Sequence, residues 1–181
     1  RCFIIEMIIE SIRSEYQRYK SLAEMAVSQV KDNDLYKVLA EESNSIPVIM
    51  NHISGNLKSR FTNFLTEDGE KPWRRRDEEF EEKSEERTIL FRRWDESWKI
   101  LVHEIGLLKD SDLSRVVRIR EKELTVADAL QRSLAHLSYH VGQIVLLARI
   151  HAGKGWKSLT IPRGKSEEYN LHPTKERQPG R

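Results

Sequence analysis

The sequence of 181 residues contains little cysteine, glycine or proline: one Cys, eight Gly and five Pro. Its single cysteine, Cys2, cannot form an intrachain disulfide, which argues against a secreted disulfide-stabilised domain. So few glycines and prolines exclude collagen-like and low-complexity chains. No hydrophobic run approaches the ~20 residues that cross a bilayer. We therefore expect a cytoplasmic protein of one domain, residues 1–181, with no membrane partner.

A large excess of charge of one sign is also missing. The chain has 31 Lys and Arg against 29 Asp and Glu, a formal net charge of +2. Domains that bind nucleic acid usually carry a strong basic excess, so we expect no nucleic-acid partner. The densest charged segment, residues 74–93, begins with Arg74, Arg75 and Arg76 and continues with acidic residues. For these arginines a solvated loop is favoured over a phosphate-binding patch.

Hydrophobic residues recur with helical spacing in four segments. The four stripes begin at Ile5, Ile46, Phe91 and Val126, and they end at Val30, Phe64, Leu108 and Ala148. Four long amphipathic helices joined by short to medium connections predict an all-α four-helix bundle of antiparallel type. This bundle would span about residues 2–154, with a short extended segment near residues 115–125 before the last helix. Residues 155–181 are expected to form an irregular tail.

Local signals mark the ends of two of these helices. Pro47 suits the first turn of the second helix, where a missing N–H costs nothing. Thr125 and Asp128 have the spacing of a capping box at the start of the fourth helix. Gly153 and Gly155 follow its last hydrophobic residue and predict its end.

Six histidines are the best candidates for a metal site. His136 and His140 are four residues apart, which places both imidazoles on one face of the fourth helix. Two histidines so placed can share one divalent ion. Leu137 occupies the position at which a zincin metalloprotease carries its general-base glutamate, and this excludes that class of enzyme.

The third ligand must come from another helix. His103 lies on the polar face of the third helix, and His172 lies in the tail. His151 follows His140 by a distance of about 16 Å along the helix, too far to share an ion. By elimination the third ligand is His52, on a polar flank of the second helix.

Two further residues lie beside the histidine pair. Gly142 is expected to permit close approach of another helix, and Gln143 lies on the histidine side, where it can support a ligand. Glu121, Glu123 and Asp128 precede the pair, and none has the spacing of a general base. This favours activation of a thiolate, which needs no protein base, over hydrolysis.

Three segments carry a resemblance to a known family. Residues 134–144 read LAHLSYHVGQI and look like the last-helix motif of the DinB/YfiT-like superfamily of metal-binding four-helix bundles. Residues 51–53, NHI, match the single histidine on the second helix of that superfamily. Residues 161–166, IPRGKS, are similar to the tail of one uncharacterised branch.

The resemblance implies a three-histidine site formed by His52, His136 and His140, often with zinc or nickel, at one end of the bundle. Relatives include thiol transferases that use bacillithiol, mycothiol or glutathione-type cofactors. We therefore expect a metal-dependent enzyme with thiol S-transferase-like activity, a divalent metal, and a small-molecule substrate or low-molecular-weight thiol. The alternatives are a metal-dependent hydrolase and a non-catalytic metal-binding or stress-related interaction protein.

Two expectations concern assembly and pH. Tyr16, Tyr19, Trp94 and Trp98 offer more aromatic surface than one thin helix seam needs, and relatives often pair, which favours a homodimer. The alternative is that these rings fill the core. Metal binding is expected to weaken as the pH falls through roughly 6.5, where free imidazoles take up protons.

Overall fold

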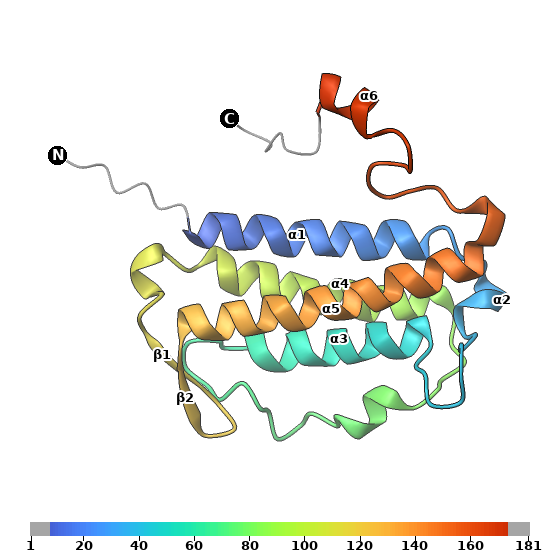
Figure 1. The fold of residues 1–181 in the computed structure, drawn as a ribbon. Helices are drawn as coiled ribbons and strands as arrows, with labels where there is room; N and C mark the ends of the chain where they lie inside the picture. Colours follow the sequence, from blue (N-terminus) through green and yellow to red (C-terminus); the bar gives the residue numbers. More distant parts are fainter. Residues whose placement is uncertain (1–7, 174–181) are drawn as a thin grey trace.

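The computed structural model describes residues 8–173, which form a mostly helical fold with one small sheet (Figure 1). The helices are α1 (Ile8–Val27), α2 (Asp32–Leu35), α3 (Ile46–Phe61), α4 (Arg87–Gly106), α5 (Val126–Ala152) and α6 (Ser166–Leu171). The strands are β1 (Val116–Ile119) and β2 (Lys122–Thr125), and three 3-10 turns are η1 (Asp77–Phe80), η2 (Asp110–Asp112) and η3 (Gly153–Gly155). The prediction of a mostly helical protein with a short extended segment before the last long helix is confirmed.

The predicted helix ends are produced by capping residues. The Ser45 hydroxyl accepts a hydrogen bond from the Val48 N–H at the start of α3, with Pro47 in the first turn. Thr125 Oγ1 accepts from the Asp128 N–H at 3.1 Å and caps α5. At the other end of α5, Gly153 has a φ of 54°, a left-handed conformation that glycine adopts without steric cost. The two helices that will carry the histidines are therefore bounded by local sequence chemistry.

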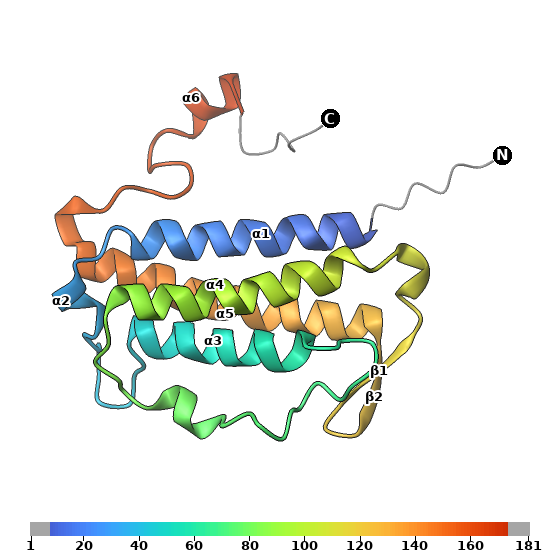
Figure 2. The same cartoon turned by 180° about the vertical axis from the view of Figure 1, so that it is seen from behind.

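The four long helices lie side by side around one hydrophobic core. Helix α1 contacts α4 and α5, and α3 contacts the same two helices. Consequently α4 and α5 lie on opposite sides of the core, between α1 and α3; Figure 1 shows α5 in front, and Figure 2 shows α4 in front. This packing buries the hydrophobic stripe of each helix.

The chain directions differ from the prediction. The colours along each helix show that α3 and α4 run the same way, as do α1 and α5 (Figures 1 and 2). An antiparallel arrangement is therefore wrong for these two pairs. The reason is the connection of residues 62–86, here called the crossover segment, which returns along α3 before α4 begins. A hydrophobic stripe indicates which face of a helix is buried but not in which direction the helix runs.

The aromatic rings that favoured a dimer lie mainly in the core. Tyr16, Trp94 and Trp98 are each at most 1% exposed, and Tyr19 is partly buried and packs against the core. Their role is therefore the alternative one, filling the core. The homodimer stays a prediction, and it no longer has these rings as support.

The C-terminal tail is less irregular than expected, because it contains η3 and the short helix α6. Trp156 and Leu159 pack against the core, as expected for the first part of the tail. Helix α6 stands apart from the long helices in both views (Figures 1 and 2). Ile5, Cys2 and the last residues of the tail lie outside the described residues. Between residues 8 and 173, no helix combines the length and apolar character needed to cross a membrane.

Replacing Trp94 with alanine tests the core. Trp94 is fully buried, so Trp94→Ala leaves a large cavity, and it also removes the hydrogen bond that the indole N–H donates to Glu24 Oε1 at 3.0 Å. We expect the free energy of unfolding in urea to fall by about 3–5 kcal/mol. The control is Trp73→Ala, at a tryptophan that is 47% exposed, for which we expect less than about 1 kcal/mol. Equal losses in the two variants would contradict the assigned core.

Candidate metal centre

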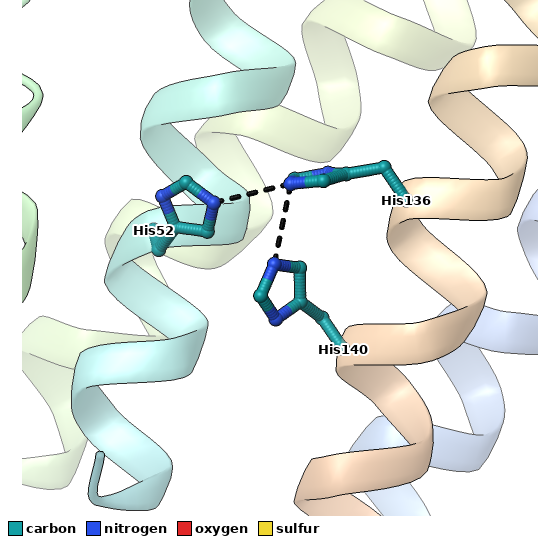
Figure 3. Close-up of side chains that lie close together, drawn as sticks. All are labelled: His52, His136 and His140. Atoms are coloured by element: carbon teal, nitrogen blue, oxygen red, sulfur yellow. Dashed lines mark hydrogen bonds between the residues drawn. The ribbon is translucent and has the colours of Figure 1, made fainter. Parts of the chain in front are cut away.

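Three histidine rings meet between α3 and α5 (Figure 3). His52 projects from α3, and His136 and His140 project from successive turns of α5. His136 Nε2 lies 3.2 Å from His52 Nε2 and 3.2 Å from His140 Nε2. Within residues 8–173 these three side chains form a group whose ligand atoms all lie within 4.8 Å of one another, which makes them candidates for holding a metal ion.

The spacing of the nitrogens suits a divalent ion. Zinc–nitrogen bonds of about 2.0–2.1 Å in a tetrahedron place two ligand nitrogens about 3.3 Å apart. The two observed separations of 3.2 Å are close to this value. The donor set therefore fits a first-row divalent metal without a large movement of the rings.

The second nitrogen of two of these rings is held by an acceptor. His52 Nδ1 lies 2.9 Å from Glu79 Oε2, and His140 Nδ1 lies 2.8 Å from Gln143 Oε1. An oxygen acceptor requires the proton on Nδ1, so His52 and His140, in the neutral form that binds a metal, each turn an unprotonated Nε2 toward the centre. Such anchoring of the far nitrogen is usual for histidines that bind metals.

Glu79 is in turn held by an arginine. Arg74 donates from Nε to Glu79 Oε1 at 2.8 Å and from Nη2 to Glu79 Oε2 at 2.9 Å. The side chains of Arg74 and Glu79 are 2% and 10% exposed. The expectation of a solvated loop is therefore wrong at Arg74, because this guanidinium is buried in an ion pair beside the site. Arg75 is exposed, as expected.

A glycine on α3 leaves room for that carboxylate. A Cβ atom at Gly55 would lie 2.1 Å from Glu79 Oε1, much closer than non-bonded atoms approach. Gly55 lies one helical turn after His52, so the absent side chain lets Glu79 reach the ring. In a helix interior glycine costs roughly 0.5–1 kcal/mol relative to alanine, and here that cost accompanies a packing function.

The model of a protein family matches residues 4–165; its description is "Protein of unknown function (DUF1572)". The chain belongs to this family. The matched residues include all three histidines, Glu79 and Gln143. The comparisons with curated proteins and with solved structures each gave no match.

The DUF1572 chain keeps its other histidines away from this centre. His103 is exposed on α4, and His172 is exposed just after α6, as expected. His151 Nε2 lies 3.1 Å from the Lys37 carbonyl oxygen, to which it can donate. The implied position at one end of the bundle is wrong: His136 lies about 15 Å from the first residue of α5 and about 24 Å from its last.

Two expectations for α5 have opposite outcomes. Gln143 contacts His140, as its position suggested. Gly142, by contrast, faces open space, because nothing lies within 4 Å of a Cβ atom built there. It does not serve the close approach of a helix.

His52 is buried, although it was placed on a polar flank. Its side chain is 5% exposed, because the crossover segment covers this face of α3 and the Phe80 ring lies 4.6 Å from the imidazole, centre to centre. The sequence contained no signal for Glu79 apart from its position in a charged run. The isolated Gly55 within a helix was the one local sign of a close approach.

Burial controls the protonation of the α5 pair. It lowers the pKa of His136 from 6.5 to about 4, with further lowering by the nearby charges of His140 and His52. Burial also lowers the pKa of His140 to about 4, against the opposing effect of the Gln143 hydrogen bond. Burial of Glu79 raises its pKa, but hydrogen bonds from His52 and Arg74 outweigh this, so its net pKa lies below the ordinary value. Neutral histidines facing one another beside an ionised carboxylate are prepared for a cation.

The lowered pKa values predict how the metal-free protein responds to acid. Unfolded His136 and His140 take up protons near pH 6.5, whereas the folded pair resists protonation down to about pH 4. Stability is therefore retained above pH 6.5 and lost as the pH falls from 6.5 toward 4. In the presence of a chelator, urea midpoints should fall between pH 7 and 5.5. A double variant, His136→Gln with His140→Gln, should show a flatter profile; an unchanged slope would contradict this assignment. Protons should likewise compete with a metal ion for His136 and His140 only at a pH lower than the value of 6.5 expected for free imidazoles.

Two glycine substitutions test the support of His52. Gly55→Ala should displace Glu79 from His52 Nδ1 and weaken zinc affinity by about 10–100-fold, as loss of such a supporting acceptor usually does. Gly142→Ala makes the same chemical change in a helix with free space, so it should keep zinc affinity and gain up to about 1 kcal/mol of stability. Competition titration with a zinc-binding dye measures both affinities. Equal affinities in the two variants would remove Glu79 from the site.

Proposed function

We propose that this protein is a metal-dependent enzyme in which His52, His136 and His140 hold one divalent ion, zinc or nickel. The observation that carries the proposal is the convergence of three imidazole nitrogens while acceptors hold the far nitrogens of His52 and His140. With Nδ1 protonated in His52 and His140, the three converging Nε2 atoms share at most one hydrogen, so at least one lone pair faces the centre without a donor. A cation at that point can be bound by all three nitrogens.

We further propose that the four long helices form a DinB-like four-helix bundle. Its support is the placement of the single histidine of the second long helix against the histidine pair of the last one, the combination that the DinB/YfiT resemblance implies. Parallel neighbours joined by a long crossover segment are compatible with such a bundle, because bundles with long connections are known.

The site is open on one side. A cavity of about 190 Å³ borders His52 and His136, so a ligand can reach the centre without unfolding the helices. Three histidine ligands leave at least one position for such a ligand, as in catalytic rather than structural zinc sites. This supports an enzyme over a metal site sealed by its own side chains. When bound, a divalent ion with three neutral ligands supplies Lewis acidity and favours an anionic fourth ligand such as a thiolate.

The residues around the centre favour thiol chemistry over hydrolysis. The carboxylate of Glu79 contacts His52, and Arg74 and His52 occupy both of its oxygens. It is therefore a positioning residue and not a free base. Asp128 is exposed and is used in the cap of α5. We infer a thiol S-transferase-like activity in which the protein orients the ligands and the thiol provides the nucleophile.

Cobalt substitution tests both parts of the proposal. Protein prepared without an affinity tag should bind one equivalent of Co²⁺ with the visible absorption of a site of low coordination number. Addition of a small thiol should then produce a sulfur-to-cobalt charge-transfer band in the near ultraviolet. His140→Ala removes a ligand and should lose both signals, whereas His103→Ala, at an exposed histidine of α4, should keep both. One equivalent of bound cobalt in His140→Ala would overturn the three-histidine site, and a wild-type spectrum unaffected by thiol would overturn the thiol role.

A further inference from the structure

The cavity beside the histidines has an unusual lining. Six arginines border it, together with His52 and His136, and no Asp or Glu of residues 8–173 does. The arginines are Arg60, Arg74, Arg76, Arg118, Arg120 and Arg132. Because the formal net charge of the whole chain is only +2, this is a local concentration of positive charge. The lining therefore calls for a ligand of opposite charge.

Four separate parts of the fold supply these side chains. Arg60 lies on α3, Arg74 and Arg76 on the crossover segment, and Arg132 on α5. Arg118 belongs to β1, and Arg120 follows it in the turn. Arg132 precedes His136 by four residues, so it lies one turn away on the same face of α5. Segments distant in the sequence thus converge on one cavity next to the proposed metal.

Three of the arginines are committed to the protein. Arg74 is paired with Glu79, Arg60 and Arg120 both pair with Glu70, and Arg60 also contacts the Gly69 carbonyl oxygen. The side chains of Arg74 and Arg60 are 2% and 14% exposed, so they form the inner wall. Burial lowers the pKa of Arg60 against the attraction of Glu70, and the charges of Arg74 and Arg120 lower it further. Positive charges in this wall therefore repel one another, which an anion would relieve.

The outer arginines are available to a ligand. Arg76 and Arg118 have side chains 51% and 64% exposed, and each pairs with an exposed carboxylate, Asp77 at 3.8 Å and Glu123 at 3.0 Å. The Arg76 guanidinium also lies over the Phe80 ring, 5.0 Å from its centre. Such surface pairs contribute little energy and exchange readily for another anion. Arg132 is exposed, and among the described residues it has no hydrogen bond or ion pair.

The hairpin turn that carries Arg120 is held in a costly conformation. Arg120 and Glu121 have φ angles of 55° and 63°, which favour glycine or asparagine in a two-residue hairpin. Asp68 compensates by accepting hydrogen bonds from both backbone N–H groups, at 2.8 and 2.7 Å. A turn with Asn and Gly would need less support, but it would remove a guanidinium from the cavity. The strained turn is consistent with a functional use of Arg120.

We propose that this cavity binds a small substrate with two or more negative charges, carboxylate or phosphate, whose anionic groups pair with Arg76, Arg118 and Arg132. The proposal rests on the proposed metal-dependent function, since it names the substrate class of that same site. A cavity of about 190 Å³ beside the histidines has room for a compact dianion. A donor atom on this molecule, such as a thiol, lies within reach of the position between His52 and His136.

Three probes separate the arginines from the metal. Succinate carries two carboxylates, inorganic phosphate tests the other oxyanion, and mercaptosuccinate adds a thiol to the two carboxylates. Calorimetric titration of metal-free protein should show saturable binding of succinate or phosphate, weakened by added salt. In zinc-loaded protein, mercaptosuccinate should bind at least tenfold more tightly than succinate.

The variants identify the groups responsible. Arg132→Gln and Arg118→Gln should each weaken anion binding by about tenfold, because each removes a charge-assisted contact. Arg75→Gln makes the same change of charge next to the cavity arginines, at an exposed residue that does not line the cavity, and should bind within twofold of wild type. His140→Ala should keep the binding of succinate and lose the extra affinity of mercaptosuccinate.

The outcomes separate the two proposals. If neither succinate nor phosphate binds wild type, or if both arginine variants bind as wild type does, the anion site is wrong even when zinc binds normally. If anions bind as expected while zinc does not, the metal-dependent function is wrong and the anion site stands. Preference for phosphate or for succinate then identifies the anionic group of the substrate.

Discussion

The arrangement of the site depends on the buried contact between His52 and Glu79. The crossover segment supplies the carboxylate, α3 supplies the ring, and Arg74 fixes the carboxylate with two hydrogen bonds. This contact determines which nitrogen of His52 carries the proton and turns the other toward α5. Without it, an imidazole beside a phenylalanine ring could rotate or change tautomer, and three converging lone pairs would not be maintained.

Sequence patterns were sufficient for features determined by neighbouring residues. The i, i+4 spacing of His136 and His140, the caps at Ser45 and Thr125, and the hydrophobic stripes all depend on residues within a few turns of each other. The choice of His52 was harder, and it relied on excluding the other histidines. A helix with both faces covered shows no clear polar side, and α3 is buried by the core on one side and by the crossover segment on the other.

The features that the sequence could not provide involve contacts between distant segments. Glu79 is 27 residues from His52, within residues 74–83, a charged run in which Phe80 is the one apolar residue. Its pairing follows from the path of the crossover segment, and that path also makes α3 and α4 parallel. Neither the charge count nor the hydrophobic periodicity of a segment indicates its route through the fold. Gly55 indicated one point on the route of the crossover segment, since a glycine inside a helix often marks the close approach of another group.

The metal ligands and most of the cavity arginines lie on different kinds of structure. All three histidines are on long helices, as are Arg60 and Arg132, whereas Arg74, Arg76 and Arg120 lie on connections and Arg118 lies on a four-residue strand next to one. Connections accept insertions and substitutions more easily than packed helices do, because fewer buried contacts depend on them. Over evolutionary time, a fold divided in this way can acquire a new substrate by changing a hairpin or a crossover while it retains the same ion.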